Sequence, residues 1–353
     1  MCILLAACGK GAEGHPSRDG RRALVMEEVV QLDDAGQPIL ARPERLSVAP
    51  DGRFFVADFS DKNVKVYAPI GRRALTIGRP GRGPGEFQAL MTAQAYGDSL
   101  VAFDFLDRRL SVFAPDGRFV RRVPLTRLAF PPFSVRVVDD SLFLAVAAMP
   151  GGERQHALAL LRPDGSLVST FFDVSRYLGG SPMVLQNVGL IADGMAGVVF
   201  AGIAGGDSVW AFDYAGKRLG AAAVDPVDPL PTTRALLEGN GGRLARPGGG
   251  YVVDGVRNLV GLVALDSGSV AMQVARYDAE TGTDPLEGGT FIVAALAKGR
   301  LATIARADLA AGLAGRDRRG APLVLRYADA EQEHYAIARL RLADAESART
   351  QGP

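Results

Sequence analysis

The chain has 353 residues, of which 48% are hydrophobic and 22% charged, and 40 basic against 39 acidic residues give a formal charge of +1. A chain this close to neutral lacks the basic surface of a nucleic-acid-binding protein, so we expect no nucleic-acid partner. The only cysteines, Cys2 and Cys8, lie at the N-terminus, so the rest of the chain has no disulfide bond. The chain has three histidines, which limits zinc binding and histidine-based catalysis. Its 43 glycines and 21 prolines, without a strict period, are typical of many tight turns.

The N-terminus reads MCILLAAC, an apolar run that ends in small residues and a cysteine. Leu5-Ala6-Ala7-Cys8 resembles the bacterial lipoprotein box, which implies acylation of Cys8 after cleavage before it. The basic start of a secretory signal is missing, as it would be if the true translation start lay upstream. The alternative is a buried apolar N-terminus with an inert cysteine.

We therefore predict that residues 1–8 are a signal and lipobox remnant and that 9–22 form a flexible tether. No other segment offers 18 uninterrupted apolar residues, so we expect membrane contact only through the lipid. The implied location is the bacterial cell envelope, on the periplasmic side or at the outer membrane. Gly9 after the cysteine favours the outer membrane, because the aspartate associated with inner-membrane retention is absent from that position.

A repeated unit follows the tether. Residues 99–123 predict a strand, a polar break, a second strand, the turn Ala114-Pro115-Asp116-Gly117 and a third strand. The unit recurs at 53–77, 141–172 and 197–223, with a weaker copy at 260–287. The turn glycines are 46, 48 and 51 residues apart, at Gly71, Gly117, Gly165 and Gly216.

A short strand precedes each unit, which makes four strands in roughly 50 residues, the size of a propeller blade. We predict an all-β fold over residues 23–343, a six-bladed β-propeller with four antiparallel strands per blade, with seven blades as the alternative. Residues 290–342 would supply the sixth blade, and 24–32 would join it to close the ring. The insertion at 226–250 is either a lid over one mouth of the channel or a disordered loop, and 344–353 form a polar C-terminal tail.

The connectors carry a family resemblance over residues 45–225. The sequence Gly83-Pro84-Gly85-Glu86-Phe87, followed by strands at 93–98 and 100–104 and by Asp116-Gly117, resembles the six-bladed propellers related to NHL repeats. In particular, it resembles the secreted and lipoprotein six-bladed propellers of bacteria. The resemblance implies a fold more than a function, because many of these proteins have no assigned activity.

The stretch IGRPGRGPGEF at 77–87 raises the question of a phosphate loop. Gly78 and Gly83 have the Walker spacing, but Pro84 and Gly85 occupy the places of the required lysine and hydroxyl residue. We therefore interpret the stretch as a crossover between blades, with Phe87 packed between them. The charged residues of this connector and of two loop tips are the candidate ligand or partner face: Arg79, Arg82, Glu86, Asp61, Lys62, Asp107 and Arg108.

Some related propellers are lyases or lactone hydrolases with a metal in the central channel. The corresponding candidates here are Asp58, Asp104, Asp254 and Asn258, with Asn63 and Asn187 as further donors. Asp58 and Asp104 occupy equivalent places after the second strand, which equally fits a side chain that caps the following loop, and we favour this structural role. We expect His156 and His334 to be surface or hydrogen-bonded residues, and Trp210 to lie in the core between blades.

No catalytic motif such as H-E-x-x-H or G-x-S-x-G occurs in the chain. The leading hypothesis is a non-enzymatic binding module whose partner is a protein, a peptide or a glycan. The alternative is a metal-assisted lyase or hydrolase that uses carboxylates in the channel. We expect no cofactor; calcium or zinc is the metal that the alternative would require.

Overall fold

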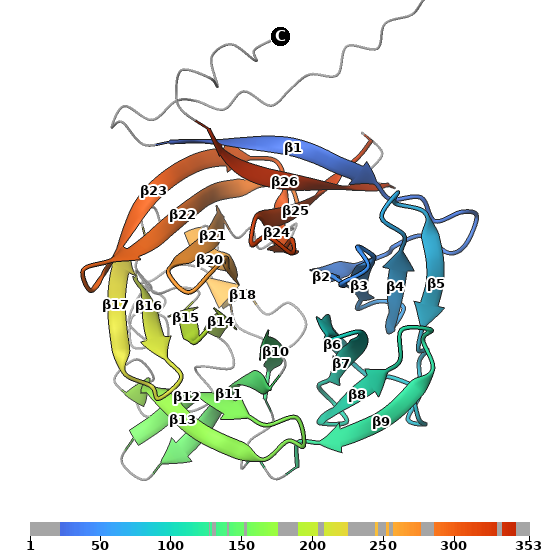
Figure 1. The fold of residues 1–353 in the computed structure, drawn as a ribbon, viewed down its shortest axis with the longest axis horizontal. Coiled ribbons are helices and arrows are strands. Elements are labelled where there is room, and N and C mark those ends of the chain that lie inside the picture. The colour runs from blue at the N-terminus through green and yellow to red at the C-terminus, as the bar shows by residue number, and fades with distance from the viewer. Residues whose placement is uncertain are drawn as a thin grey trace, which may run out of the picture.

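The protein is an all-β propeller in the computed structural model, as the repeat predicts (Figure 1). The structure describes residues 22–126, 128, 132–139, 141–151, 154–175, 190–203, 208–224, 244–245, 252–253, 257–276, 286–329 and 334–343. Cys8, the tether at 9–21 and the tail at 344–353 lie outside this set. Among the described residues, no helix has the length and apolar character of a membrane-spanning segment.

The first four blades are each made of four consecutive antiparallel strands. Blade 1 contains β2 (Pro43–Val48), β3 (Phe54–Asp58), β4 (Asn63–Tyr67) and β5 (Arg73–Ile77), and blade 2 contains β6 (Leu90–Tyr96), β7 (Ser99–Asp104), β8 (Arg109–Phe113) and β9 (Phe119–Pro124). Blade 3 contains β10 (Ser134–Asp139), β11 (Leu142–Gly151), β12 (Arg154–Leu161) and β13 (Leu167–Asp173), and blade 4 contains β14 (Leu190–Met195), β15 (Val198–Ile203), β16 (Ser208–Asp213) and β17 (Arg218–Ala223).

The last two blades correct the expected boundary between units five and six. Blade 5 contains β20 (Arg257–Ala264), β21 (Ser269–Arg276), β22 (Gly289–Ala297) and β23 (Arg300–Leu309). The expectation that the segment from 290 onward forms the sixth blade is therefore wrong for β22 and β23. The connection from β21 to β22 spans residues 277–288, far longer than the loop at 59–62 in blade 1, and this displaces the strand pair from the 50-residue period.

Blade 6 closes the ring with both ends of the described chain. It contains β24 (Gly312–Arg316), β25 (Pro322–Tyr327) and β26 (Tyr335–Ala343), and its outer strand is β1 (Ala23–Gln31). β1 pairs antiparallel with β26 from Ala23 opposite Ala343 to Gln31 opposite Ala336, with one irregularity between Glu28 and Val30. The prediction that the early strand completes the last blade is confirmed, and the described chain forms six blades. Between blades 4 and 5, β18 (Leu244–Ala245) and β19 (Val252–Val253) form a short two-stranded ladder; most of the 226–250 insertion lies outside the described residues.

The core lies in the seams between neighbouring blades. Strands in the middle of a blade, such as β3 and β8, are buried on both faces, whereas the outer strand β9 is largely exposed. Phe87 is fully buried between blades 1 and 2, with its ring centroid 6.0 Å from that of Phe113. Trp210 packs against Phe172 in the seam between blades 3 and 4, as predicted, and their ring centroids are 5.0 Å apart. Burial on both faces explains why the central strands read as continuous apolar runs.

Candidate functional site

One face of the ring carries both the loops between second and third strands and the connectors between blades. We call it the connector face, and define it by loops 59–62 and 105–108 and by connectors 32–42 and 78–89. Strand direction places these four segments on the same side, whereas hairpin turns such as 68–72 and 114–118 lie on the opposite side. All seven predicted ligand-face residues belong to the connector face.

Asp58 and Asp104 are fully buried and hold the connectors in place. The Asp58 carboxylate accepts hydrogen bonds from the amides of Ala41 (2.8 Å) and Arg42 (3.2 Å), and from those of Ser60 and Asp61 in its own loop. Asp104 accepts from the amides of Gln88 (2.7 Å), Ala89 (3.1 Å) and Asp107 (3.2 Å). These bonds support the loop-capping role over the metal-binding one for both residues.

Two of the other proposed metal donors are described, and they lie in different blades. Asn63 begins β4 in blade 1 and Asn258 is a buried residue of β20 in blade 5, whereas Asp254 and Asn187 lie outside the described residues. Within the described ranges, no three His, Cys, Asp or Glu side chains gather closely enough to hold a metal ion.

Lys65 is a buried cation beneath the connector face that the sequence interpretation missed. Its side chain is 1% exposed, and its Nζ lies 2.7 Å from a carboxylate oxygen of Asp58 and 2.7 Å from one of Asp61. It also donates to the carbonyl oxygen of Ile39, so it joins blade 1 to the connector at 32–42. The only sequence signal is a lysine in the middle of the apolar strand NVKVY.

The protonation of Asp58 follows from these contacts. Burial raises the pKa of Asp58, but hydrogen bonds from Lys65 and from the amides of Ala41 and Asp61 outweigh it, so the net pKa lies below 3.8. A carboxyl group whose pKa is lower in the folded protein than in the unfolded chain stabilises the fold at any pH above the unfolded-state pKa. This stability is lost as the pH falls through the pKa of the folded state. Protonation of Asp58 therefore weakens the clamp on the connector in acid.

A second buried group fastens the same connector. Arg73 donates to the Asp34 carboxylate and to the carbonyl oxygen of Pro38, and its guanidinium lies 4.9 Å from the centroid of the Tyr67 ring. The Tyr67 hydroxyl donates to Asp34 at 2.7 Å. Burial, followed by the bond to Asp34, raises the pKa of Tyr67 well above its usual value of 10.0, so the hydroxyl keeps its proton.

The glycine-rich connector is organised by Arg109, at the start of β8. Its Nη1 and Nη2 donate to the carbonyl oxygens of Arg82 (3.2 Å), Gly83 (3.3 Å) and Glu86 (2.7 Å). The Glu86 carboxylate in turn accepts from the Gly83 amide and from Arg79 Nε, both at 2.8 Å. A side chain at Gly78 (φ +82°) would lie 2.3 Å from the ring of Phe87, so the glycine serves backbone geometry.

A pocket of about 380 Å³ lies between this connector and the outer strands of blade 2. It is lined by Arg82, Asp107, Arg109, Arg122 and Pro124. Three of these five side chains are guanidinium groups and one is a carboxylate. The sequence analysis named Arg82 and Asp107 as residues of the ligand face but did not include Arg109 or Arg122.

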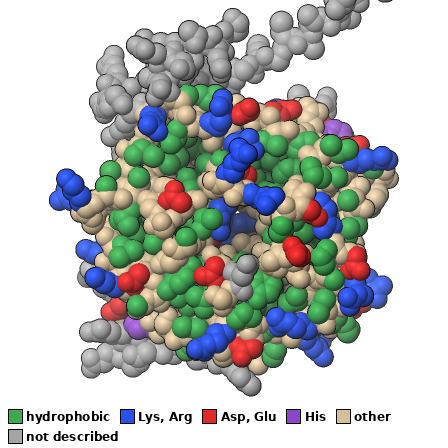
Figure 2. Space-filling model, viewed as in Figure 1, with side chains coloured by type: hydrophobic (Ala, Val, Ile, Leu, Met, Phe, Trp, Pro, Cys, Tyr) green, Lys and Arg blue, Asp and Glu red, His purple; other side chains and the backbone are tan. Residues whose placement is uncertain are grey.

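The central channel is also rich in arginine. Figure 2 shows basic side chains gathered around and inside the hollow at the centre of the ring. On the inner strands, Arg45 donates to the carbonyl oxygen of Leu262 (3.2 Å), and Arg316 pairs with Asp193 at 2.8 Å. These bonds join β2 to β20 and β14 to β24, so the two arginines tie blades together.

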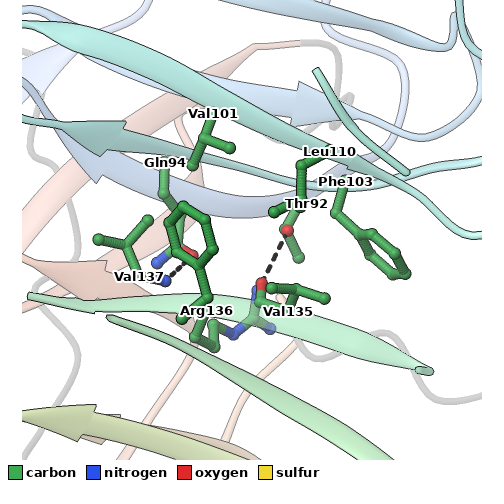
Figure 3. Close-up of a pocket in the computed structure, with 9 residues that line it drawn as sticks. Thr92, Gln94, Val101, Phe103, Leu110, Val135, Arg136 and Val137 are labelled. Carbon is green, nitrogen blue, oxygen red and sulfur yellow. Dashed lines mark hydrogen bonds between the residues drawn. The ribbon is translucent and has the colours of Figure 1, made fainter. Parts of the chain in front are cut away.

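The seam between blades 2 and 3 is packed and offers no ligand site. Figure 3 shows the side chains of β6 and β10 that meet there. Thr92 Oγ1 donates to the carbonyl oxygen of Val135 (3.1 Å), and the amide of Val137 donates to Gln94 Oε1 (2.9 Å). The seam leaves no volume that a water molecule could occupy.

The two described histidines hold no common site. His156 Nδ1 lies 2.8 Å from the Thr170 hydroxyl in blade 3, and His334 is an exposed residue whose Nε2 is 3.9 Å from Asp329 in blade 6. Both match the expected surface or hydrogen-bonded role.

Comparison with known proteins identifies the fold. No protein-family profile and no curated protein matches the chain. Among solved structures, the chain is similar to a Bacteroides fragilis protein that is assigned as an exported protein. The TM-score is 0.64 and the sequence identity is 10%, and the alignment covers 90% of this chain and 95% of that one. It is also similar to a DUF4221 family member from Bacteroides vulgatus, with a TM-score of 0.60 and 12% identity over 93% of this chain and 100% of that one.

A virginiamycin B lyase from Staphylococcus aureus aligns at a TM-score of 0.44 and 10% identity, over 90% of this chain and 99% of that one. At such identities the likeness concerns the fold alone. The chain is thus a β-propeller similar in fold to a bacterial protein assigned as exported.

The buried clamp gives a direct stability test. In Lys65→Met the Asp58 carboxylate loses its buried counter-charge, and we expect the free energy of unfolding to fall by about 3–5 kcal/mol in urea denaturation at pH 7. Lys62→Met, in the same loop, is the matched control and should change it by less than about 0.5 kcal/mol. Equal small effects from both substitutions would contradict the clamp.

Proposed function

We propose that the protein is a lipid-anchored, non-enzymatic binding module of the bacterial cell envelope that holds a protein, peptide or glycan partner on its connector face. The observation that carries this proposal is the contrast between the two sides of that face. Beneath it, Asp58, Asp104 and Lys65 are buried and fully engaged in fixing the backbone. Above it, side chains such as Arg108 and Leu106 stand in solvent.

The outward side chains have the character of an interaction surface. Leu106 is 60% exposed at the tip of loop 105–108, and Ile39 is 49% exposed in connector 32–42. Arg79, Arg82 and Arg108, in connector 78–89 and loop 105–108 of the same face, are also exposed. Arginine next to exposed apolar side chains is typical of binding surfaces, and loops fixed by the core bind with a smaller entropic cost.

The location part of the proposal rests on Leu5-Ala6-Ala7-Cys8 and on the fold likeness to a bacterial protein assigned as exported. The resemblance of residues 45–225 to the secreted and lipoprotein propellers related to NHL repeats supports the same proposal.

The enzymatic alternative requires a metal held by channel carboxylates. Asp58 and Asp104 would have to give up their bonds to backbone amides in order to bind one. Metal analysis of the purified protein, with melting temperatures before and after chelation, separates the two functions: stoichiometric calcium or zinc and a large loss of stability would support the alternative.

The lipid anchor is tested at Cys8. We expect the protein, expressed from its native locus in a bacterial host, to incorporate a labelled fatty acid and to fractionate with membranes. Cys8→Ser should abolish both properties, because Cys8 is the cysteine that directly follows Leu5-Ala6-Ala7 and would be acylated. Unchanged labelling and membrane association of Cys8→Ser, with Cys2→Ser as the control, would overturn the assignment.

The connector face is tested by site-specific photocrosslinking in the envelope. A photoreactive residue at Leu106 should give a discrete crosslinked product. The same residue at Ile70 is the control, because Ile70 is 78% exposed in the hairpin turn on the opposite face. Products from Ile70 alone, or equal products from both positions, would contradict the proposed binding face.

A further inference from the structure

We propose that the pocket between the glycine-rich connector and blade 2 binds a dianionic oxyanion group, such as a sulfate or phosphate monoester or a pair of neighbouring carboxylates. This inference rests on the proposed binding function and names the chemistry that the connector face recognises. Its basis is the placement of Arg82, Arg109 and Arg122 around one pocket with a single acid, Asp107.

Arg109 supplies a fixed positive wall. Its residue is 6% exposed, and its Nη1 and Nη2 are held by the three carbonyl oxygens of the connector. Nη2 also lies 3.0 Å from Asp107 Oδ2. A guanidinium already fixed by the backbone loses little freedom when an anion arrives, so its field acts without reorganisation.

Arg82 and Arg122 supply the groups that can bind directly. Arg82 donates only through Nε, to Gln88 Oε1 at 2.9 Å, which leaves its terminal nitrogens without an acceptor among the described residues. The exposed side chain of Arg122 forms no hydrogen bond or ion pair with the described part of the chain. Each therefore offers paired N–H donors, the geometry that matches carboxylate and phosphate oxygens.

Charge and size define the ligand. The three arginines and one aspartate of the pocket lining have a net formal charge of +2. A dianion neutralises this charge and a monoanion does not. A volume of about 380 Å³ accommodates the anionic group together with part of the molecule that carries it. Leu106, which precedes Asp107 in the chain, is exposed and is an apolar side chain that this remainder could contact.

The test is isothermal titration calorimetry of the full chain with sodium sulfate, inorganic phosphate and succinate, at low ionic strength. Acetate is the monoanionic comparator. We expect at least one dianion to bind, acetate to bind at least tenfold more weakly, and affinity to fall as sodium chloride is added. The dianion that binds most tightly distinguishes a sulfate, phosphate or dicarboxylate source.

Variants then locate the site. Arg122→Gln and Arg82→Gln should each weaken dianion binding at least tenfold with little change in the melting temperature, because both side chains are exposed. Arg121→Gln is the matched control: it is the adjacent exposed arginine of β9, absent from the pocket lining and bonded to the carbonyl oxygen of Pro163 at 3.3 Å. It should bind as the wild type does.

The proposal is overturned if no dianion binds the wild type, or if Arg121→Gln weakens binding as much as Arg122→Gln, which would indicate a general charge effect. These outcomes are separable from failure of the binding function. A crosslinked partner at Leu106 with no dianion binding defeats the pocket alone. Dianion binding that depends on Arg122, without any crosslinked partner, defeats the partner-binding function alone.

Discussion

The pairing of β1 with β26 is the constraint on which the rest of the structure depends. A propeller of separate blades has an exposed strand edge wherever the ring remains open, and here the first described strand covers the edge of the last. β1 then leads directly into connector 32–42, which crosses to blade 1. The strand that completes the ring is therefore continuous with one of the connectors that form the connector face.

Buried cations convert this closure into a rigid surface. Lys65 and Arg73 fasten connector 32–42, and Arg109 fastens connector 78–89, in each case through backbone carbonyl oxygens. Buried ion pairs add little net stability because desolvation offsets their attraction, but they fix one geometry, since every other arrangement leaves a charge unpaired. The consequence is a functional division among the arginines: buried ones hold loops, and exposed ones such as Arg122 face solvent.

The fold was largely predictable from the sequence because its signals are local. Turn glycines such as Gly117 (φ +85°) recur at a nearly constant spacing, and the strands between them have a simple apolar pattern. Prediction failed at blade 5, where the long 277–288 connection breaks the period and the hairpin turn is instead Lys298-Gly299. The site was less predictable: Asp58 and Arg82 were noticed, but the roles of Lys65 and Arg109 depend on carbonyl groups distant in sequence.

Removal of the closing strand tests the central claim most directly. A protein that lacks residues 1–32 loses the β1–β26 ladder and the burial of Leu24 and Leu32, each worth about 1.5–3 kcal/mol. A protein that lacks only residues 1–21 keeps both. Thermal denaturation and size-exclusion chromatography of the pair should show a much lower melting temperature and self-association for the first protein alone. Equal melting temperatures and two monomers would contradict closure by β1.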